Sequence, residues 1–134
     1  MTKRKAAFTF VLFLVSGLAV LSSGSLAAPT SSAKTGVACP KTALALEVNS
    51  IAPAATAALA DESAASKPQV VSASLATLDA DRGSMAKRQC GAKAWQRTVV
   101  VYINLRAYKS ASLSSRVDFV ARFADGYKVW EVVH

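Results

Sequence analysis

Residues 97–108, RTVVVYINLRAY, alternate between apolar and mixed side chains, and this pattern restricts the possible folds more than any other in the chain. A period of two residues is that of a β-strand, in which successive side chains point to opposite faces of a sheet. We therefore expect a strand with one face in the core and a polar, aromatic face in solvent. The core face would carry Val99, Val101, Ile103, Leu105 and Ala107, and the other face Thr98, Val100, Tyr102, Asn104, Arg106 and Tyr108.

Two further strands are expected near the C-terminus. Residues 116–123 alternate in the same way, Asp125-Gly126 is a hairpin signal, and 127–134 would form the returning strand. A two-residue turn would place Phe119 opposite Val132, which pairs apolar side chains, whereas a three-residue turn would place it opposite Glu131. Cross-strand chemistry favours the first register. The face packed against the helices would then carry Val117, Phe119, Ala121, Phe123, Trp130 and Val132.

Helical spacing dominates residues 40–90. Pro40 can open a helix with a stripe that includes Leu44, and Pro53 should end or kink that helix near Ile51. The Ala-rich residues 52–66 would form a second short helix or a weakly held low-complexity segment. Another stripe is expected to form a last helix that stops at Cys90-Gly91, and it consists of Val71, Leu75, Leu78, Arg82 and Met85.

The expected fold class is therefore α+β: a signal helix, then two or three helices packed on a three-stranded antiparallel meander. Helices would occupy residues 40–90 and strands 97–134. Three cations, an apolar run of 16 residues and small residues at the N-terminus are typical of a secretory signal peptide. We assign 1–27 to this peptide, 28–36 to a flexible leader and 37–134 to one small domain.

Export of the chain is the expected localisation, either secreted or periplasmic. Cleavage before Ala28 is favoured over a permanent signal anchor, because a spanning helix needs about 20 apolar residues. Membrane contact would then occur only through the signal segment before cleavage. In an oxidising compartment Cys39 and Cys90 are expected to form a disulfide, with two free thiols or an intermolecular link as alternatives.

The charge of the chain is uneven, with 16 Lys and Arg against 8 Asp and Glu and most of the excess after residue 81. Such a positive half can attract nucleic acid or an anionic polymer by electrostatic steering. The simpler interpretation is that these cations keep the domain soluble and pair partly with the acidic half. One His and two Cys leave no material for a usual multi-ligand metal site, so neither a metal nor a cofactor is expected.

Binding residues are sought on the mixed face of the sheet: Tyr102, Arg106 and Tyr108, with Arg122 of the next strand. Tyrosines beside arginines suit stacking and anion contact, although any one-sided sheet presents a polar face to water. No catalytic residue is predicted, because His134 is the last residue and no nucleophile elbow is present. Asp118, Glu131 and Arg122 are interpreted as a solvated charge cluster.

The stretches CGAKAWQRTVVVY, SASLSSRVDFVARF and DGYKVWEVVH, between residues 90 and 134, resemble a group of small secreted bacterial proteins of unknown function. The order of helices before a meander is also similar to the cystatin-like and NTF2-like folds. These include protease inhibitors, carrier modules and a few isomerases, and fold analogy alone does not confer a function.

The sequence thus favours an exported, noncatalytic binding or accessory protein. An extracellular protein or an anionic cell-envelope polymer would be its partner. The alternatives are a basic binder of anionic polymer or nucleic acid, and a small NTF2-like hydrolase or isomerase.

Overall fold

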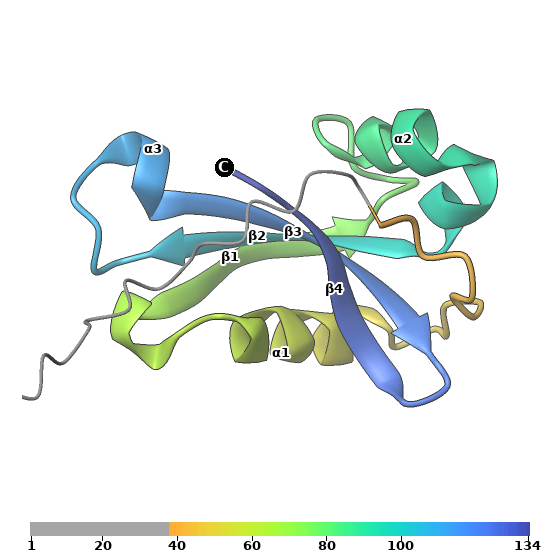
Figure 1. The fold of residues 1–134 in the computed structure, drawn as a ribbon, viewed down its shortest axis with the longest axis horizontal. Coiled ribbons are helices and arrows are strands. Elements are labelled where there is room, and N and C mark those ends of the chain that lie inside the picture. The colour runs from red at the N-terminus through yellow and green to blue at the C-terminus, as the bar shows by residue number, and fades with distance from the viewer. Residues whose placement is uncertain (1–37) are drawn as a thin grey trace, which may run out of the picture. The chain divides into compact units, whose positions relative to one another are not determined.

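A four-stranded antiparallel sheet in the order β1-β2-β3-β4 lies at the centre of the structure, a computed structural model that describes residues 38–134. The α+β class is confirmed, whereas the predicted signal peptide and leader lie outside the described residues. In Figure 1, α1 covers one face of the sheet, and α2 and α3 lie over the two ends of the other face. The elements are α1 (Ile51–Asp61), the 3₁₀ helix η1 (Ala64–Ser66), β1 (Pro68–Leu75), α2 (Gly83–Gln96), β2 (Thr98–Leu105), α3 (Ala111–Ser114), β3 (Ser115–Phe123) and β4 (Gly126–Val133).

The first strand corrects two expectations. The meander has four strands rather than three, because residues expected in the last helix form β1, which pairs with β2 from Pro68↔Leu105 to Leu75↔Val99. The helical stripe was wrong, since Val71 is 69% exposed and Leu78 is 76% exposed. The β-branched residues of PQVVSASL find a long-range partner in β2, and pairing with it outweighs a weak helical pattern.

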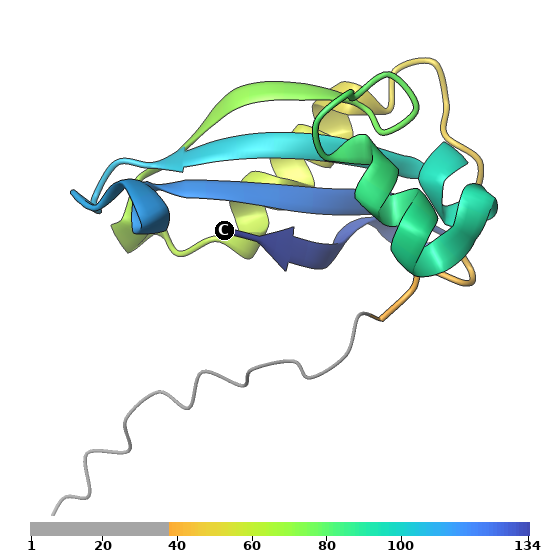
Figure 2. The same cartoon turned by 90° about the horizontal axis from the view of Figure 1, so that it is seen from above.

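Both faces of the sheet are covered, so the expected solvent face of β2 was also wrong. Val99, Val101 and Ile103 are buried in a cluster with Ala54 and Ala58 of α1. On the opposite face, a second cluster joins residues of β2, β3 and β4 to α2, and it includes Ala86, Val100, Phe119 and Trp130. Figure 2, which views the sheet from above, shows α2 lying across one end of this second face.

The proline in α1 occupies the start of the helix rather than its end. α1 begins at Ile51, and Pro53 is its third residue, where the backbone has no N–H partner to lose. The helix expected from Pro40 to about Ile51 is absent, because residues 40–50 form turns and extended chain. Of the two alternatives for the Ala-rich segment, the short helix is confirmed.

The favoured β3–β4 register was wrong, and the rejected pairing of Phe119 with Glu131 holds beyond a bulge while the turn itself follows neither alternative. Near the turn Phe123 pairs with Gly126, while farther along Phe119 pairs with Glu131, and the register shifts between Phe119 and Val120. Trp130 is the extra residue of this bulge and its ring lies 5.6 Å from that of Phe119, centroid to centroid. Because both faces are apolar, matching apolar pairs could not identify the register. The Trp130 indole N–H has no hydrogen-bond partner among the described residues.

The predicted disulfide is confirmed. Cys39 and Cys90 are joined with their Cα atoms 5.4 Å apart. The bond ties the turn before α1 to the middle of α2, where Gly91 has a φ of 85° and a ψ of 175° and divides the helix into two pieces. The predicted stop at Cys90-Gly91 thus ends the first helical piece, and a second piece continues to Gln96.

Candidate anion-binding surface

The structure does not bring the four predicted binding residues together on one surface. Arg106 follows the last residue of β2, and Arg122 follows Ala121, which pairs with the first residue of β2. At about 3.3 Å per residue the two arginines are roughly 25–30 Å apart along the sheet. Arg106 and Tyr108 are exposed beyond β2, whereas Arg122 pairs with Glu47 at 2.6 Å.

Tyr102 has a structural partner at the beginning of α2. Its hydroxyl donates to Asp79 Oδ1 at 3.3 Å, and the same oxygen accepts from the backbone N–H groups of Arg82 at 2.6 Å and Gly83 at 2.8 Å. Burial and the Asp79 hydrogen bond raise the pKa of Tyr102 to about 12. Burial alone would raise the pKa of Asp79, but these donors together with Ser74 lower it. Asp79 therefore caps α2 and fixes where the helix begins.

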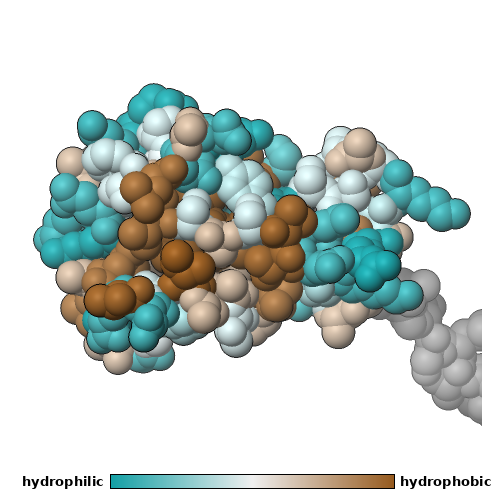
Figure 3. Space-filling model, turned by 180° about the vertical axis from the view of Figure 1, so that it is seen from behind, coloured by the Kyte–Doolittle hydropathy of each residue, from teal (hydrophilic) through white to brown (hydrophobic). Residues whose placement is uncertain are grey.

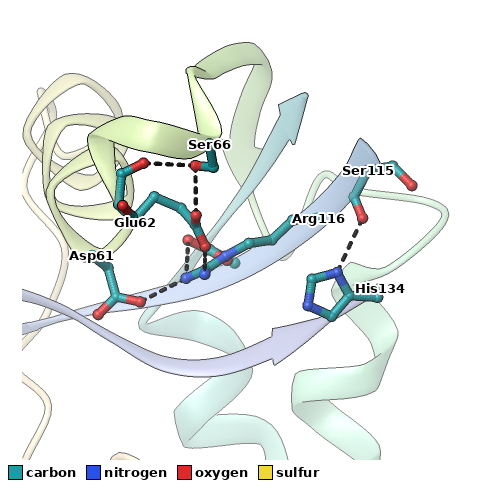
Figure 4. Close-up of polar contacts among 8 residues, drawn as sticks. Asp61, Glu62, Ser66, Ser115, Arg116 and His134 are labelled. Atoms are coloured by element: carbon teal, nitrogen blue, oxygen red, sulfur yellow. Dashed lines mark hydrogen bonds and ion pairs between the residues drawn. The ribbon is translucent and has the colours of Figure 1, made fainter. Parts of the chain in front are cut away.

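The buried charges of the described chain converge on Arg116 of β3 (Figure 4). Its guanidinium contacts Asp118 at 2.5 Å, Asp61 at 2.6 Å and Glu62. Asp118 is fully buried, so its interpretation as a solvated charge was wrong. Burial raises the pKa of Asp118, and the Arg116 guanidinium opposes that rise. The arrangement joins the end of α1 to β3 and satisfies the one cation with three carboxylates.

This cluster leaves much of the positive charge without acidic partners. Within residues 38–134, five of the eight carboxylates form ion pairs, and they pair with only three cations. The other nine of twelve Lys and Arg residues have no ion pair in this part of the chain. The cations and the carboxylates of this part of the chain are therefore not matched one to one. They divide into Lys41, Arg82, Lys87, Arg88, Lys93 and Arg97 at the α2 end, and Lys67, Arg106 and Lys109 at the opposite end.

Four of these cations are exposed on or beside α2, and we call Lys41, Lys87, Arg88 and Lys93 the α2 cation surface. Their placement follows from the helix, because Ala86 and Ala94 face the core and leave the intervening positions in solvent. The break at Gly91 also folds α2 back, so that Lys87 Nζ lies 4.7 Å from the centre of the Trp95 ring. A straight helix would separate these two residues by about 12 Å along its axis.

Lys41 joins this surface through the disulfide. Together with Lys93 it lines a cavity of about 210 Å³ whose other walls are Cys39, Pro40, Cys90 and Ala94. The Arg88 guanidinium donates to Ser84 Oγ at 2.8 Å, and Ser84 lies one helical turn before Arg88 in α2. The α2 cation surface thus combines a broken helix and a disulfide-linked turn.

His134 and Asp118 have separate partners in the part of the chain that the structure describes. His134 Nδ1 lies 3.3 Å from the backbone carbonyl oxygen of Ser115, and the Asp118 carboxylate is held by Arg116, so the two do not form an acid–base pair (Figure 4). Residues 38–134 contain no group of three His, Cys, Asp or Glu side chains placed to hold a metal ion.

The apolar surface is divided into several groups. Figure 3 shows several such groups across one face, with residues of intermediate hydropathy between them and hydrophilic residues around the edge. Val48, Val71 and Leu78 are the most exposed large apolar residues. None of the helices between residues 38 and 134 is long and apolar enough to cross a membrane.

No protein-family model matches the chain, no curated protein matches its sequence, and no solved structure matches its fold. Sequence reasoning noted the positive half but not the α2 cation surface. The spacing of Lys87, Arg88 and Lys93 was a possible signal, but the partner Lys41 is 46 or more residues away and only the fold brings it near.

Proposed function

We propose that this protein is an exported, noncatalytic binding protein that holds an anionic cell-envelope polymer on the α2 cation surface. The observation that carries the proposal is the absence of acidic partners for Lys41, Lys87, Arg88 and Lys93 among residues 38–134. Lys41 and Lys93 line one cavity, and Lys87 and Arg88 are neighbours in the chain. Exposed cations at such short range repel each other, and a polyanion relieves that repulsion while releasing its counterions.

Export is supported by two features. The N-terminus has the charged, apolar and small-residue order of a signal peptide, and disulfides such as Cys39–Cys90 persist in oxidising compartments. N-terminal sequencing of the exported protein should begin at or close to Ala28. Intact Met1 in a membrane fraction would contradict this part of the proposal.

A polymer with little aromatic content is favoured over a nucleic acid. Proteins that bind single strands combine cations with exposed aromatic rings on which bases stack. On the α2 cation surface the nearest ring is Trp95, whose face Lys87 occupies and whose N–H donates to the Ala76 carbonyl at 2.9 Å. The exposed Tyr108 lies beyond β2, at the other end of the sheet.

The test compares two double variants that remove the same charge from opposite ends of the sheet. Lys87→Gln with Arg88→Gln should weaken retention on immobilised polyphosphate and on polygalacturonate. Lys67→Gln with Lys109→Gln should change it little. For single-stranded polyanions each contact contributes about 0.7 to the salt slope, so the first pair should reduce that slope by roughly 1.4.

Three results would contradict the proposal: equal losses in the two double variants, retention that does not change with salt, and preferential binding of single-stranded RNA. Equal losses would mean that net charge rather than the α2 cation surface governs binding. Circular dichroism and the urea midpoint of both variants serve as folding controls, because all four side chains are exposed.

A further inference from the structure

The cavity beside the disulfide has a composition different from the rest of the α2 cation surface. Lys41 and Lys93 line it, while the remaining lining residues are Pro40, Ala94 and the two bonded cysteines. Pro40 and Ala94 are buried, so this wall is apolar and fixed. Lys41 and Lys93 are themselves exposed, and both ammonium groups would attract an anion that lies against this apolar wall.

The size and the type of cation indicate the chemical group. A volume of about 210 Å³ is that of roughly seven waters at about 30 Å³ each, enough for a phosphate group with part of the chain that carries it. A phosphate group presents up to three acceptor oxygens in different directions, so two separate ammonium groups can each contact one, whereas a carboxylate presents only two oxygens in one plane. Both cations of this cavity are lysines.

The disulfide is one of the connections that place Lys41 beside Lys93. Among the described residues, the segment 38–43 is held by the Cys39–Cys90 bond, by a 3.7 Å contact of the Cys39 sulfur with the Gln89 carbonyl, by the burial of Pro40 and Ala43, and by a hydrogen bond from the Arg97 guanidinium to the Ala43 carbonyl. Its backbone hydrogen bonds are local, within the turn that ends at Ala43. Anchoring to β3 begins only at Leu44, whose N–H donates to the Arg122 carbonyl at 2.7 Å.

We propose that the cavity between Lys41 and Lys93 is a binding site for one phosphate group of the polymer, held in shape by the Cys39–Cys90 disulfide. This inference rests on the proposed function and makes it more specific, because it selects phosphate-bearing polymers over carboxylate-bearing ones. The remaining cations, Lys87 and Arg88, would contact neighbouring charges of the same chain.

The test uses the disulfide-bonded exported protein titrated with inorganic phosphate at constant ionic strength, followed by amide NMR. Saturable shifts are expected at residues 39, 41 and 90–94. Lys41→Gln and Lys93→Gln should each weaken phosphate binding roughly tenfold, as expected for the loss of one charge-assisted contact. Lys67→Gln removes the same charge at the opposite end of the sheet and should leave the phosphate affinity unchanged.

A second measurement tests the role of the disulfide. A dithiol reductant supplies two electrons and two protons, the S–S bond becomes two thiols, and the reductant becomes a disulfide. Phosphate affinity should then fall as in Lys41→Gln, while amides of the β2 core keep their positions. Undiminished affinity in the reduced, folded protein would overturn the disulfide's role. If reduction unfolds the domain, the Lys41→Gln comparison decides the inference.

The failures of the two proposals are distinguishable. Non-saturating shifts spread equally over Lys87 and Lys67, with retention on polyphosphate intact, would refute the phosphate site and leave polymer binding standing. Saturable phosphate binding without retention of any polymer would support the site and refute the proposed function. Equal retention on polygalacturonate and polyphosphate would refute the selection of phosphate.

Discussion

Replacing Arg116 with Met should destabilise the domain strongly at neutral pH and much less in acid. The substitution removes the cation that contacts Asp118, Asp61 and Glu62 and replaces it with an unbranched apolar side chain. Asp118 has no exposed surface, whereas Asp61 is 49% exposed and Glu62 still accepts a hydrogen bond from Ser66 Oγ at 2.9 Å. The loss in the free energy of unfolding should therefore come mainly from the buried Asp118 carboxylate, which is left without its cation.

Breaking a buried ion pair by removing one partner costs about 3–5 kcal/mol. A domain of this size unfolds with about 5–15 kcal/mol in total, and each lost kcal/mol lowers Tm by about 4–8 °C. At pH 7.5 the Arg116→Met variant should therefore melt at least 12 °C below the wild type, by the lower of these estimates.

The pH dependence identifies the cause. Burial raises the pKa of Asp118 even with Arg116 present, and without the guanidinium the pKa should rise further. The folded state then binds a proton more tightly than the unfolded state, so the variant gains stability as the pH falls from the folded pKa toward the unfolded value near 3.9.

Urea unfolding of wild type and variant at pH 7.5 and pH 5 measures the effect. The double variant Arg116→Met with Asp118→Asn provides the control, because it removes the buried charge and should recover more than half of the lost stability at pH 7.5. The reasoning is refuted if the single variant loses less than about 1 kcal/mol at pH 7.5, far below the expected range. A deficit of the same size at pH 5 would also refute it.

Two other changes test the connections that hold α2 in place. Replacing Cys39 and Cys90 together with Ser should cost on the order of 4 kcal/mol, since the bond closes a loop with a sequence separation of 51, and calorimetry should show a lower Tm. An unchanged Tm would mean that the bond adds nothing to stability. Asp79→Ala should cost about 1–2 kcal/mol at pH 7, because the N–H groups of Arg82 and Gly83 lose their acceptor. The pKa of Asp79 is lowered in the folded protein, so its contribution to the free energy of unfolding is complete above the ordinary pKa of 3.8. That contribution is lost as the pH falls through the pKa of the folded state. The stabilities of wild type and variant should therefore converge in acid. A difference between the urea midpoints of wild type and variant that is the same at pH 7 and pH 3 would contradict that account.

The local patterns of the sequence determined much of the sheet. Residues 97–108 and 116–123 alternate with a period of two, and both ranges correspond to strands, β2 and β3, because a long β-branched pattern needs little help from context. The pairing of two cysteines in an exported chain of this size was likewise predictable from composition and is confirmed.

Tertiary structure decided what local patterns could not. Residues 68–75 have some helical spacing and some β-propensity, and the long-range partner β2 selects the strand. Once α1 and α2 cover opposite faces of the sheet, an alternating strand no longer has a solvent face, so the predicted binding face of β2 was lost. For the same reason Asp118 became a buried partner of Arg116.

The α2 cation surface is the clearest case of a property that only the fold creates. The sequence contains every cation of this surface and gave the net charge correctly, but it did not predict which cations remain without partners. Arg116 pairs with three carboxylates: one at the end of α1, one directly after α1 and one on its own strand. These three carboxylates are therefore not paired with the other cations. The disulfide then places Lys41 beside Lys93, because a covalent bond across 51 residues sets a distance that no local spacing determines.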